Sequence, residues 1–393
     1  MSNTRLYERK TKEEKPVIAI CYDFDKTLTE TDMQAQGFIQ SIGYDVSEFW
    51  KKTNAMAENA SMDQNLSWMY AMITESRGKE YVTRDSLRKY GAQVKFFPGV
   101  ESWFDRINEY GREKGIIVEH YIISSGLSEM IEGTSIGQKG VFTKIYASAF
   151  LFGENGDAIW PAQVVNYTNK TQFLFRIEKG TLDVNDQGVN EYFEENQKRV
   201  PFRNIIYIGD SATDIPCMKL VNSKGGHSIG VYNPNEENND SVHRLLRENR
   251  IRYYAPATYE EGERLDELIK TIINRTAENE HLEQIHAECD SEARASTMDK
   301  ETMARQHRES LILALRSSNS FRNTHMVVRE LNDVKSTEWS QEDICELCRI
   351  ALYNSQVNYI LTDDDVSEFY GRLIKQSRRS DANIDYVREM LAM

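Results

Sequence analysis

Residues 17–29 read VIAICYDFDKTLT, an apolar run that ends in two acids separated by one residue. An unbroken apolar run of this length predicts a buried strand, and Pro16 is tolerated at the first position of a strand. The strand would place Asp23 and Asp25 at its carboxyl end, where ligands bind in open α/β sheets. If the strand continues that far, the two side chains point the same way, and a metal ion or a shared proton must offset their repulsion. A turn or a helix cap after the strand is the alternative.

Strands alternate with helices over the first part of the chain, and only helical periods follow. This alternation predicts a parallel α/β sheet, with further strands at 116–123, 144–150, 204–208, 227–232 and 253–257. Helical spacing of apolar residues directly behind the first strand predicts an inserted block of helices. The predicted segments are a polar N-terminal segment at 1–15, an α/β core at 16–30 and 97–275, the helical insertion at 31–96, a linker or solvated helix at 276–299, and an all-α C-terminal domain at 300–393.

Polar side chains follow two more strands where each strand ends. The strand at 116–123 runs into Ser124 and Ser125 just before a helix, which is a favourable place for an anion. The strand at 204–208 runs into Asp210 and, four residues later, Asp214. Carboxyl ends of neighbouring parallel strands meet at one edge of a sheet, so these groups are candidates for the same site as the first two acids.

A lysine stands at the start of a predicted helix that begins near Asn169. Cations prefer the opposite end of a helix, so Lys170 is electrostatically misplaced unless it reaches for an anion. A surface lysine whose ammonium extends to solvent is the alternative.

Composition narrows the classes of function. The chain has 393 residues and a net charge of −14, which argues against a broad basic face for nucleic acid. The same acidity repels phosphorylated substrates, so phosphate chemistry would need local cations. No apolar run approaches the roughly 18 residues of a membrane helix, and the first residues contain no signal-peptide core. Five cysteines, an odd number, indicate reduced thiols and predict a cytoplasmic protein.

Other groups that could suggest metal or redox sites have simpler interpretations. Cys345 and Cys348 fall on one apolar helical face, which predicts core residues. The trio at 363–365 precedes an apolar helix and is typical of helix capping. His120 sits inside an apolar strand, which favours a structural role. The remaining candidates for a metal site lie in a polar stretch, and their spacing does not place them on one face of a helix: His281, His286 and Cys289.

Four of these features occur in the order of the four motifs of the haloacid dehalogenase (HAD) superfamily, which the chain resembles over roughly residues 16–275. They are Asp23-x-Asp25-x-Thr27-Leu28, the strand ending in Ser124, the helix-start lysine Lys170, and Gly209-Asp210-x-x-x-Asp214. The resemblance is to the phosphoserine-phosphatase-like branch, whose helical cap is inserted between the first two motifs. It implies a Rossmann-like parallel α/β core and a cap at 31–96. Lys179 competes with Lys170 for the third motif.

The resemblance also implies an activity, that of a phosphoric monoester hydrolase using Mg²⁺. The ion would be held by the carboxylates of Asp23 and Asp210 and the backbone carbonyl of Asp25. Asp23 would attack phosphorus to form an aspartyl-phosphate, and Asp25 would act as acid and then base.

The other motif residues would bind phosphate or orient the groups that do. Ser124, Ser125 and Lys170 would hold the phosphoryl oxygens, and Thr27 would join them or fix the position of Asp25. Asp214 would orient the metal ligands or the lysine.

The substrate implied is a small phosphorylated molecule, because a closing helical cap excludes polymers. Lys26 and Asp32 stand where phosphoserine phosphatases carry Ser and Glu, and the cap has no convincing substrate-binding arginine, so phosphoserine is not favoured. The apolar cap residues either line the pocket or form the cap core: Met33, Phe38, Trp68 and Met69.

Two other functions stay open as alternatives. One is a phosphotransferase that uses the same intermediate. The other is a ligand-sensing regulatory protein that acts through its C-terminal helices. No nucleic acid and no membrane are expected as partners, and the C-terminal helices are candidates for a homo-oligomer contact or for binding a protein.

Overall fold

The computed structural model describes residues 7, 9–194, 197–236, 239–297, 300–334, 339–377 and 381–392. The predicted N-terminal segment, linker and C-terminal domain therefore each lie partly outside the described residues. The chain divides into two compact units, one of residues 12–281 and one of residues 282–393 with the N-terminal residues. No described helix is both long and apolar enough to cross a membrane.

The first unit is built on a seven-stranded sheet in the order β4-β3-β2-β1-β5-β6-β7. All neighbours are parallel except β3 and β4, which form an antiparallel hairpin. The predicted parallel sheet is confirmed, with strand ends shifted by a few residues. The strands are β1 (Val17–Tyr22), β2 (Ile117–Leu127), β3 (Lys144–Phe152), β4 (Ala158–Gln163), β5 (Ile205–Gly209), β6 (His227–Tyr232) and β7 (Tyr253–Pro256).

Strand β1 is central because it is apolar on both faces. Every residue of β1 is buried, and alternate side chains enter two separate hydrophobic cores. One core contains Ile18 and Ile20 with helices α5 (Val100–Glu113) and α11 (Arg264–Thr297). The other core contains Ala19 and Cys21, together with helices α8 (Thr171–Lys179), α9 (Ile215–Ser223) and α10 (Asp240–Arg247).

The strand register brings three chain segments to one edge. Tyr22 is the partner of both Ile122 on β2 and Ile208 on β5, so the residues that follow these strands emerge together. The backbone N–H of Asp23 donates to the carbonyl of Ile208 at 2.9 Å, which continues the ladder by one bond. The strand itself ends at Tyr22, so Asp25 lies in a turn beyond the strand.

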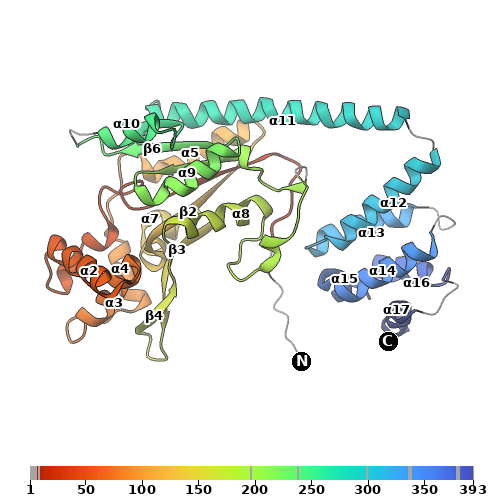
Figure 1. Ribbon diagram of the computed structural model, residues 1–393, viewed down its shortest axis with the longest axis horizontal. Coiled ribbons are helices and arrows are strands. Elements are labelled where there is room, and N and C mark those ends of the chain that lie inside the picture. The colour runs from red at the N-terminus through yellow and green to blue at the C-terminus, as the bar shows by residue number, and fades with distance from the viewer. Residues whose placement is uncertain are drawn as a thin grey trace. The chain divides into compact units, whose positions relative to one another are not determined.

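The cap is a compact insertion whose ends lie side by side. Thr29 and Phe96 form an isolated antiparallel bridge, and the Phe97 N–H donates to the Leu28 carbonyl at 2.9 Å. The larger helices begin at side-chain caps from Asp45, Asp63 and Thr83. Figure 1 shows these helices grouped together in red and orange. The cap comprises a 3-10 turn (Met33–Ala35), α1 (Phe38–Ser41), α2 (Val46–Ala60), α3 (Gln64–Glu75) and α4 (Arg84–Gly91).

Short helical segments complete the first unit. They are α6 (Ser128–Gly133), α7 (Ser135–Gln138) and 3-10 turns at Tyr167–Lys170, Gln187–Asn190, Phe202–Asn204 and Ala212–Asp214. For the stretch at 276–299, the sequence predicts a linker or a solvated helix. Helix α11 continues through Thr297, and its residues from His281 to Ala293 are exposed, so the solvated helix is the alternative that the structure shows. Polar, helix-favouring residues explain both its continuity and its exposure.

The C-terminal unit is helical with a core of its own. Its helices are α12 (Lys300–Arg316), α13 (Phe321–Asp333), α14 (Gln341–Tyr353), α15 (Ser355–Tyr359), α16 (Asp364–Ile374) and α17 (Ala382–Ala392). Helix α14 begins with a capping box between Ser340 and Asp343. Cys348 is buried in the core and Cys345 packs against it, as predicted.

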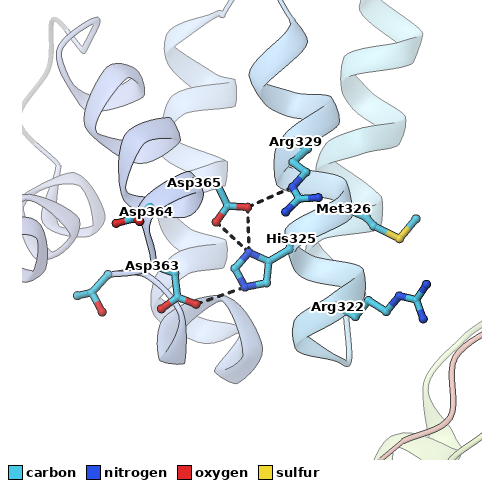
Figure 2. Close-up of a pocket in the computed structure, with 8 residues that line it drawn as sticks. Arg322, His325, Met326, Arg329, Asp363, Asp364 and Asp365 are labelled. Carbon is cyan, nitrogen blue, oxygen red and sulfur yellow. Dashed lines mark hydrogen bonds and ion pairs between the residues drawn. The ribbon is translucent and has the colours of Figure 1, made fainter.

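The acidic trio of this unit contacts a histidine and an arginine of α13 in place of the predicted side-chain cap. Asp363 occupies the N-cap position of α16, but its side chain makes no capping hydrogen bond. Figure 2 shows His325 of α13 between Asp363 and Asp365. Its Nε2 lies 3.3 Å from the first carboxylate and its Nδ1 2.9 Å from the second. Arg329 lies 3.5 Å from Asp365 as well. The trio thus ties α13 to the start of α16.

Candidate active site

Acidic and hydroxyl side chains from three segments converge at the carboxyl edge of the sheet. Asp23 follows β1, Ser124 lies near the end of β2, and Asp210 and Asp214 follow β5. Asp23, Ser124 and Asp214 are all at least nine-tenths buried. Asp23, Asp210 and Asp214 each offer a carboxylate oxygen within 4.8 Å of the others. The three acids therefore form one cluster, as their positions after the strands predict.

The buried cation of this cluster is Lys170. It stands at the end of a 3-10 turn, immediately before α8, and is fully buried. Its Nζ lies 2.8 Å from Oδ1 of Asp214 and 3.4 Å from Oδ1 of Asp23. Burial disfavours the charged form, but Asp214 and Asp23 outweigh it and leave the pKa of Lys170 raised. The ammonium is therefore charged at neutral pH.

The competing lysine has another role. The Nζ of Lys179, at the end of α8, donates to the backbone carbonyl of Val189 at 2.8 Å. This contact holds the loop that follows α8. The structure thus places Lys170, and not Lys179, beside the aspartates.

Asp214 uses both of its oxygens for protein contacts. Its Oδ1 accepts from Lys170 and from the hydroxyl of Tyr207, each at 2.8 Å. Its Oδ2 accepts from the backbone N–H and the hydroxyl of Ser211 at 3.1 and 3.0 Å. Gly209 makes room for this carboxylate, because a Cβ there would lie 2.6 Å from the Asp214 Cγ. With its hydrogen bonds satisfied, Asp214 is suited to holding the lysine in place.

Asp23, in contrast, has a carboxylate oxygen without a hydrogen-bond donor among the described residues. Its Oδ1 is buried and has no hydrogen-bond donor among the described residues, although the Lys170 ammonium lies nearby. Burial, followed by the charge of Asp214, raises the pKa of Asp23 to about 6 against the lowering effect of Lys170. Burial, with Asp214 and Asp23, also raises the pKa of Asp210. The carboxylates of Asp23 and Asp210, which offer oxygens within 4.8 Å of each other, fit a hard cation such as Mg²⁺, which takes oxygen ligands.

Asp25 is held by the start of the cap. Its Oδ1 accepts from the backbone N–H of Met33 at 2.7 Å. Gly126 leaves space for the other oxygen, because a Cβ there would lie 2.9 Å from Oδ2 of Asp25. Burial is the largest cause of a raised pKa for Asp25, and the charges of Asp32 and Asp23 add to it. The carboxyl is thus biased towards its protonated form.

Thr27 and Ser125 occupy different positions in the site. The Thr27 hydroxyl donates to Oδ1 of Asp210 at 3.4 Å, which favours a role in orienting Asp210. Its predicted contact with phosphate stays a prediction. The Oγ of Ser125 is buried without a partner among the described residues and lines the cavity beside Asp25. Tyr259, which sequence reasoning missed, fixes this turn by donating its hydroxyl to the Thr27 carbonyl at 2.8 Å.

A cavity of about 370 Å³ lies between Asp25 and the cap. Trp68 lines it, whereas Phe38 and Met69 belong to the core, and Met33 packs its terminal carbon close to Gly126. Sequence reasoning missed several cap residues in the wall. They come from the 3-10 turn, α2 and α3: Gln34, Trp50, Asn54, Gln64 and Asn65.

The two charged residues that replace the Ser and Glu of phosphoserine phosphatases pair with each other. Lys26 and Asp32 also line the cavity, and they form an ion pair of 3.1 Å. The arginines of the cap lie elsewhere. Arg88 pairs with Glu132 at 2.7 Å, Arg84 lies within 3.9 Å of the same carboxylate, and Arg77 lines a separate cavity. Among the described residues, the wall of the 370 Å³ cavity contains no arginine.

A parallel α/β sheet with clustered carboxylates and a buried lysine at its carboxyl edge defines a hydrolase of the type that the sequence resembles. The model of the haloacid dehalogenase-like hydrolases matches residues 20–219, and the chain belongs to this family. The predicted superfamily and the predicted fold class are confirmed. The phosphoserine-phosphatase-like branch stays a prediction.

Three individual proteins illustrate the range of similarity. An uncharacterized protein of Borreliella burgdorferi is 27% identical over 281 residues, which span 64% of this chain and 95% of that protein. A HAD family hydrolase of Salmonella enterica serovar Typhi is 17% identical with a TM-score of 0.44, covering 66% of this chain and 73% of that one. A probable phosphoserine phosphatase of Vibrio cholerae is 12% identical with a TM-score of 0.44, covering 68% and 67%.

Proposed function

We propose that this chain is a Mg²⁺-dependent phosphatase that hydrolyses a small phosphorylated metabolite through an aspartyl-phosphate on Asp23. The observation that carries the proposal is the state of Asp23. Its Oδ1 is buried, lacks a hydrogen-bond donor among the described residues, and lies 3.4 Å from the Lys170 ammonium. A carboxylate oxygen in this state is available to attack phosphorus, and the ammonium attracts the anionic phosphoryl group to it.

The site must offset the charge of the substrate. A phosphate monoester is anionic and the chain carries a net charge of −14, so attraction must be local. Lys170 binds one side of the phosphoryl group, and the hydroxyls of Ser124 and Ser125 donate to its oxygens. Asp23, Asp210 and the backbone carbonyl of Asp25 would hold Mg²⁺, which when bound neutralises phosphoryl charge as a Lewis acid.

Asp25 acts as the acid and then as the base. Burial, with the charges of Asp32 and Asp23, raises the pKa of Asp25, so its carboxyl carries a proton for the departing alcohol. The Met33 N–H occupies Oδ1, which leaves Oδ2 for proton transfer. Once the alcohol has left, the same carboxylate takes a proton from the water that attacks the aspartyl-phosphate. The two carboxyls therefore have separate tasks.

The test is hydrolysis of a generic aryl phosphate with and without Mg²⁺. The variant Asp23→Asn keeps the shape of the side chain and removes the nucleophile, so kcat should fall by at least about 10³-fold. Asp85→Asn is the matched control, because Asp85 is exposed on α4, outside the site. Equal activity of Asp23→Asn and the unmodified protein would overturn the proposal, as would full activity of the unmodified protein after removal of Mg²⁺.

We also propose that the protein works in the cytoplasm. All five cysteines lie in the described part of the chain and none forms a disulfide, which suits a reducing compartment. Fractionation of the native cells would test this proposal.

A further inference from the structure

We propose that the group released from phosphate is uncharged and carries a hydroxyl-bearing ring, and that Gln34 and Trp50 of the cap recognise it. The inference rests on the proposed function, since it concerns the cavity that Asp25 lines. A sugar ring has this chemistry.

Gln34 lines the cavity, and none of the hydrogen bonds of the described residues involves its amide. The residue is 2% exposed, so it lies almost entirely inside the protein surface. An amide at a cavity wall gains hydrogen bonds from a ligand that carries hydroxyls. Its position is also fixed relative to the acid, because Gln34 directly follows Met33, whose N–H holds Asp25. The amide is therefore anchored next to the place where the alcohol leaves.

Trp50 carries a buried donor that has no partner among the described residues. Its indole N–H is buried and finds no acceptor among the described residues, although the ring lines the cavity. Trp68, in the same wall, shows the contrast: its N–H donates to Oδ1 of Asn65 at 3.1 Å. Asn54 lies four residues after Trp50 on α2 and also lines the cavity, so one helix face presents an indole and an amide together.

The charge distribution of the cavity wall disfavours a leaving group that carries a charge. The cap residues that line the cavity after Asp32 are amides and indoles, without a charge. Lys26 and Asp32 neutralise each other at 3.1 Å. A carboxylate or ammonium group entering this wall would lose its water without gaining a counter-charge. Hydroxyls lose nothing comparable, because a carboxamide both donates to them and accepts from them, and an indole offers a flat apolar face to a ring.

A hydroxyl-bearing ring can come from a sugar phosphate or from a nucleoside monophosphate. The cavity has a volume of about 370 Å³, which is near the small end of the range for ligand sites and suits a single ring. Both sources carry the hydroxyl-bearing ring that the wall would recognise, so one experiment compares them.

The experiment compares kcat/KM in Mg²⁺ across matched esters. The panel is a hexose 6-phosphate, a pentose 5-phosphate, a nucleoside 5′-monophosphate, phosphoserine, phosphoethanolamine and an aryl phosphate. At least one sugar-containing ester should exceed phosphoserine and phosphoethanolamine by about 10-fold or more. Preference for either charged ester would overturn the inference and leave the phosphatase intact. Failure to hydrolyse any ester, the aryl phosphate included, would overturn both proposals.

Two variants test whether Gln34 and Trp50 recognise the leaving group. Gln34→Leu and Trp50→Phe remove the hydrogen-bonding groups and keep side-chain bulk, so each should raise KM for the preferred ester by about 10-fold with a smaller change in kcat. The ratio of kcat/KM for that ester to kcat/KM for the aryl phosphate should fall accordingly. Trp160→Phe is the control, because Trp160 is 66% exposed on β4. Gln34 is buried, so thermal unfolding checks that its variant folds. An unchanged ratio in Trp50→Phe would overturn the inference even if the Gln34 variant failed to fold.

Discussion

The ammonium of Lys170 lies 2.8 Å from Oδ1 of Asp214, and both side chains are fully buried. The pair joins the start of α8 to the turn that precedes α9, and Tyr207 and Ser211 hold the carboxylate in place. Because these donors use both oxygens of Asp214, its contribution to catalysis is expected to pass through the lysine.

Asp214→Asn should therefore lower kcat by about 10- to 100-fold, since a misplaced ammonium no longer meets the phosphoryl group. In the double variant with Lys170→Met, the loss of kcat should not exceed that of the more impaired single variant, because both changes remove the same function. Steady-state kinetics of the three variants provide the measurement. Losses that multiply would contradict the positioning role.

Replacement of each lysine separates the two candidates of the third motif. Lys170→Met should reduce kcat/KM by at least about 10²-fold, because it removes the cation beside Asp23. Lys179→Met removes contacts with the Val189 and Glu191 carbonyls and the Phe193 ring, all in the loop after α8, and should retain activity. The opposite ranking in an aryl phosphate assay would transfer the catalytic role to Lys179.

Gly126 keeps space open for the acid. A methyl group there would lie 2.3 Å from Cε of Met33 and 2.9 Å from Oδ2 of Asp25. The tip of methionine can move aside, but the carboxylate cannot move without losing its position, so Gly126→Ala should lower kcat by at least about 10-fold. Gly371→Ala is the control, since nothing lies within 4 Å of a Cβ there. Normal kcat in Gly126→Ala would show that Asp25 tolerates displacement.

The stability of the fold should depend on pH through His120. Its Nδ1 is 3.0 Å from the Tyr22 hydroxyl, its Nε2 is 3.1 Å from Oδ1 of Asn108, and burial lowers the pKa of His120 to about 3. The unfolded chain binds a proton near the ordinary pKa of about 6.5 while the folded chain does not, so unfolding becomes easier as pH falls from about 6.5 towards 3.

The expected slope from this one group is about 1.4 kcal/mol of unfolding free energy per pH unit within that window. Urea unfolding at about pH 5 and about pH 7 should show a smaller loss for His120→Gln than for the unmodified protein. His227, whose pKa burial also lowers, to about 4, is common to both proteins and cancels in the difference. Parallel losses in the two proteins would refute the assignment to His120.

A second buried pair should govern stability without affecting chemistry. Arg199 donates to both oxygens of Glu119 at 2.8 Å, and both residues are more than nine-tenths buried. Arg199→Met removes the guanidinium that pairs with both Glu119 and Glu13 and should cost about 3–5 kcal/mol. Adding Glu119→Gln should restore part of the loss, because one of the two carboxylates that lost the guanidinium is then uncharged. Denaturant unfolding gives both values, and a cost under about 1 kcal/mol for the single variant would contradict the prediction.

Local patterns predicted much of the fold. The apolar run ending at Tyr22, the strand ending near Ser124 and the strand before Asp210 are all visible in sequence, because burial of a parallel strand requires continuous apolar residues. The rule that ligands bind at carboxyl ends then places the acids correctly. The all-helical character of the C-terminal unit also follows from periodicity. The linker was less predictable, since a polar stretch is compatible with both a coil and a solvated helix.

The sequence by itself therefore determined the strands, the family and the acids of the candidate site. Only the tertiary structure decided which lysine joins Asp23, where the Thr27 hydroxyl points, and which cap residues face the cavity. These facts depend on how segments distant in sequence pack together, and local spacing carries no information about that packing. Gln34 and Trp50 became distinctive only when the folded cap brought both to the cavity wall and left the Trp50 indole N–H buried without a partner among the described residues.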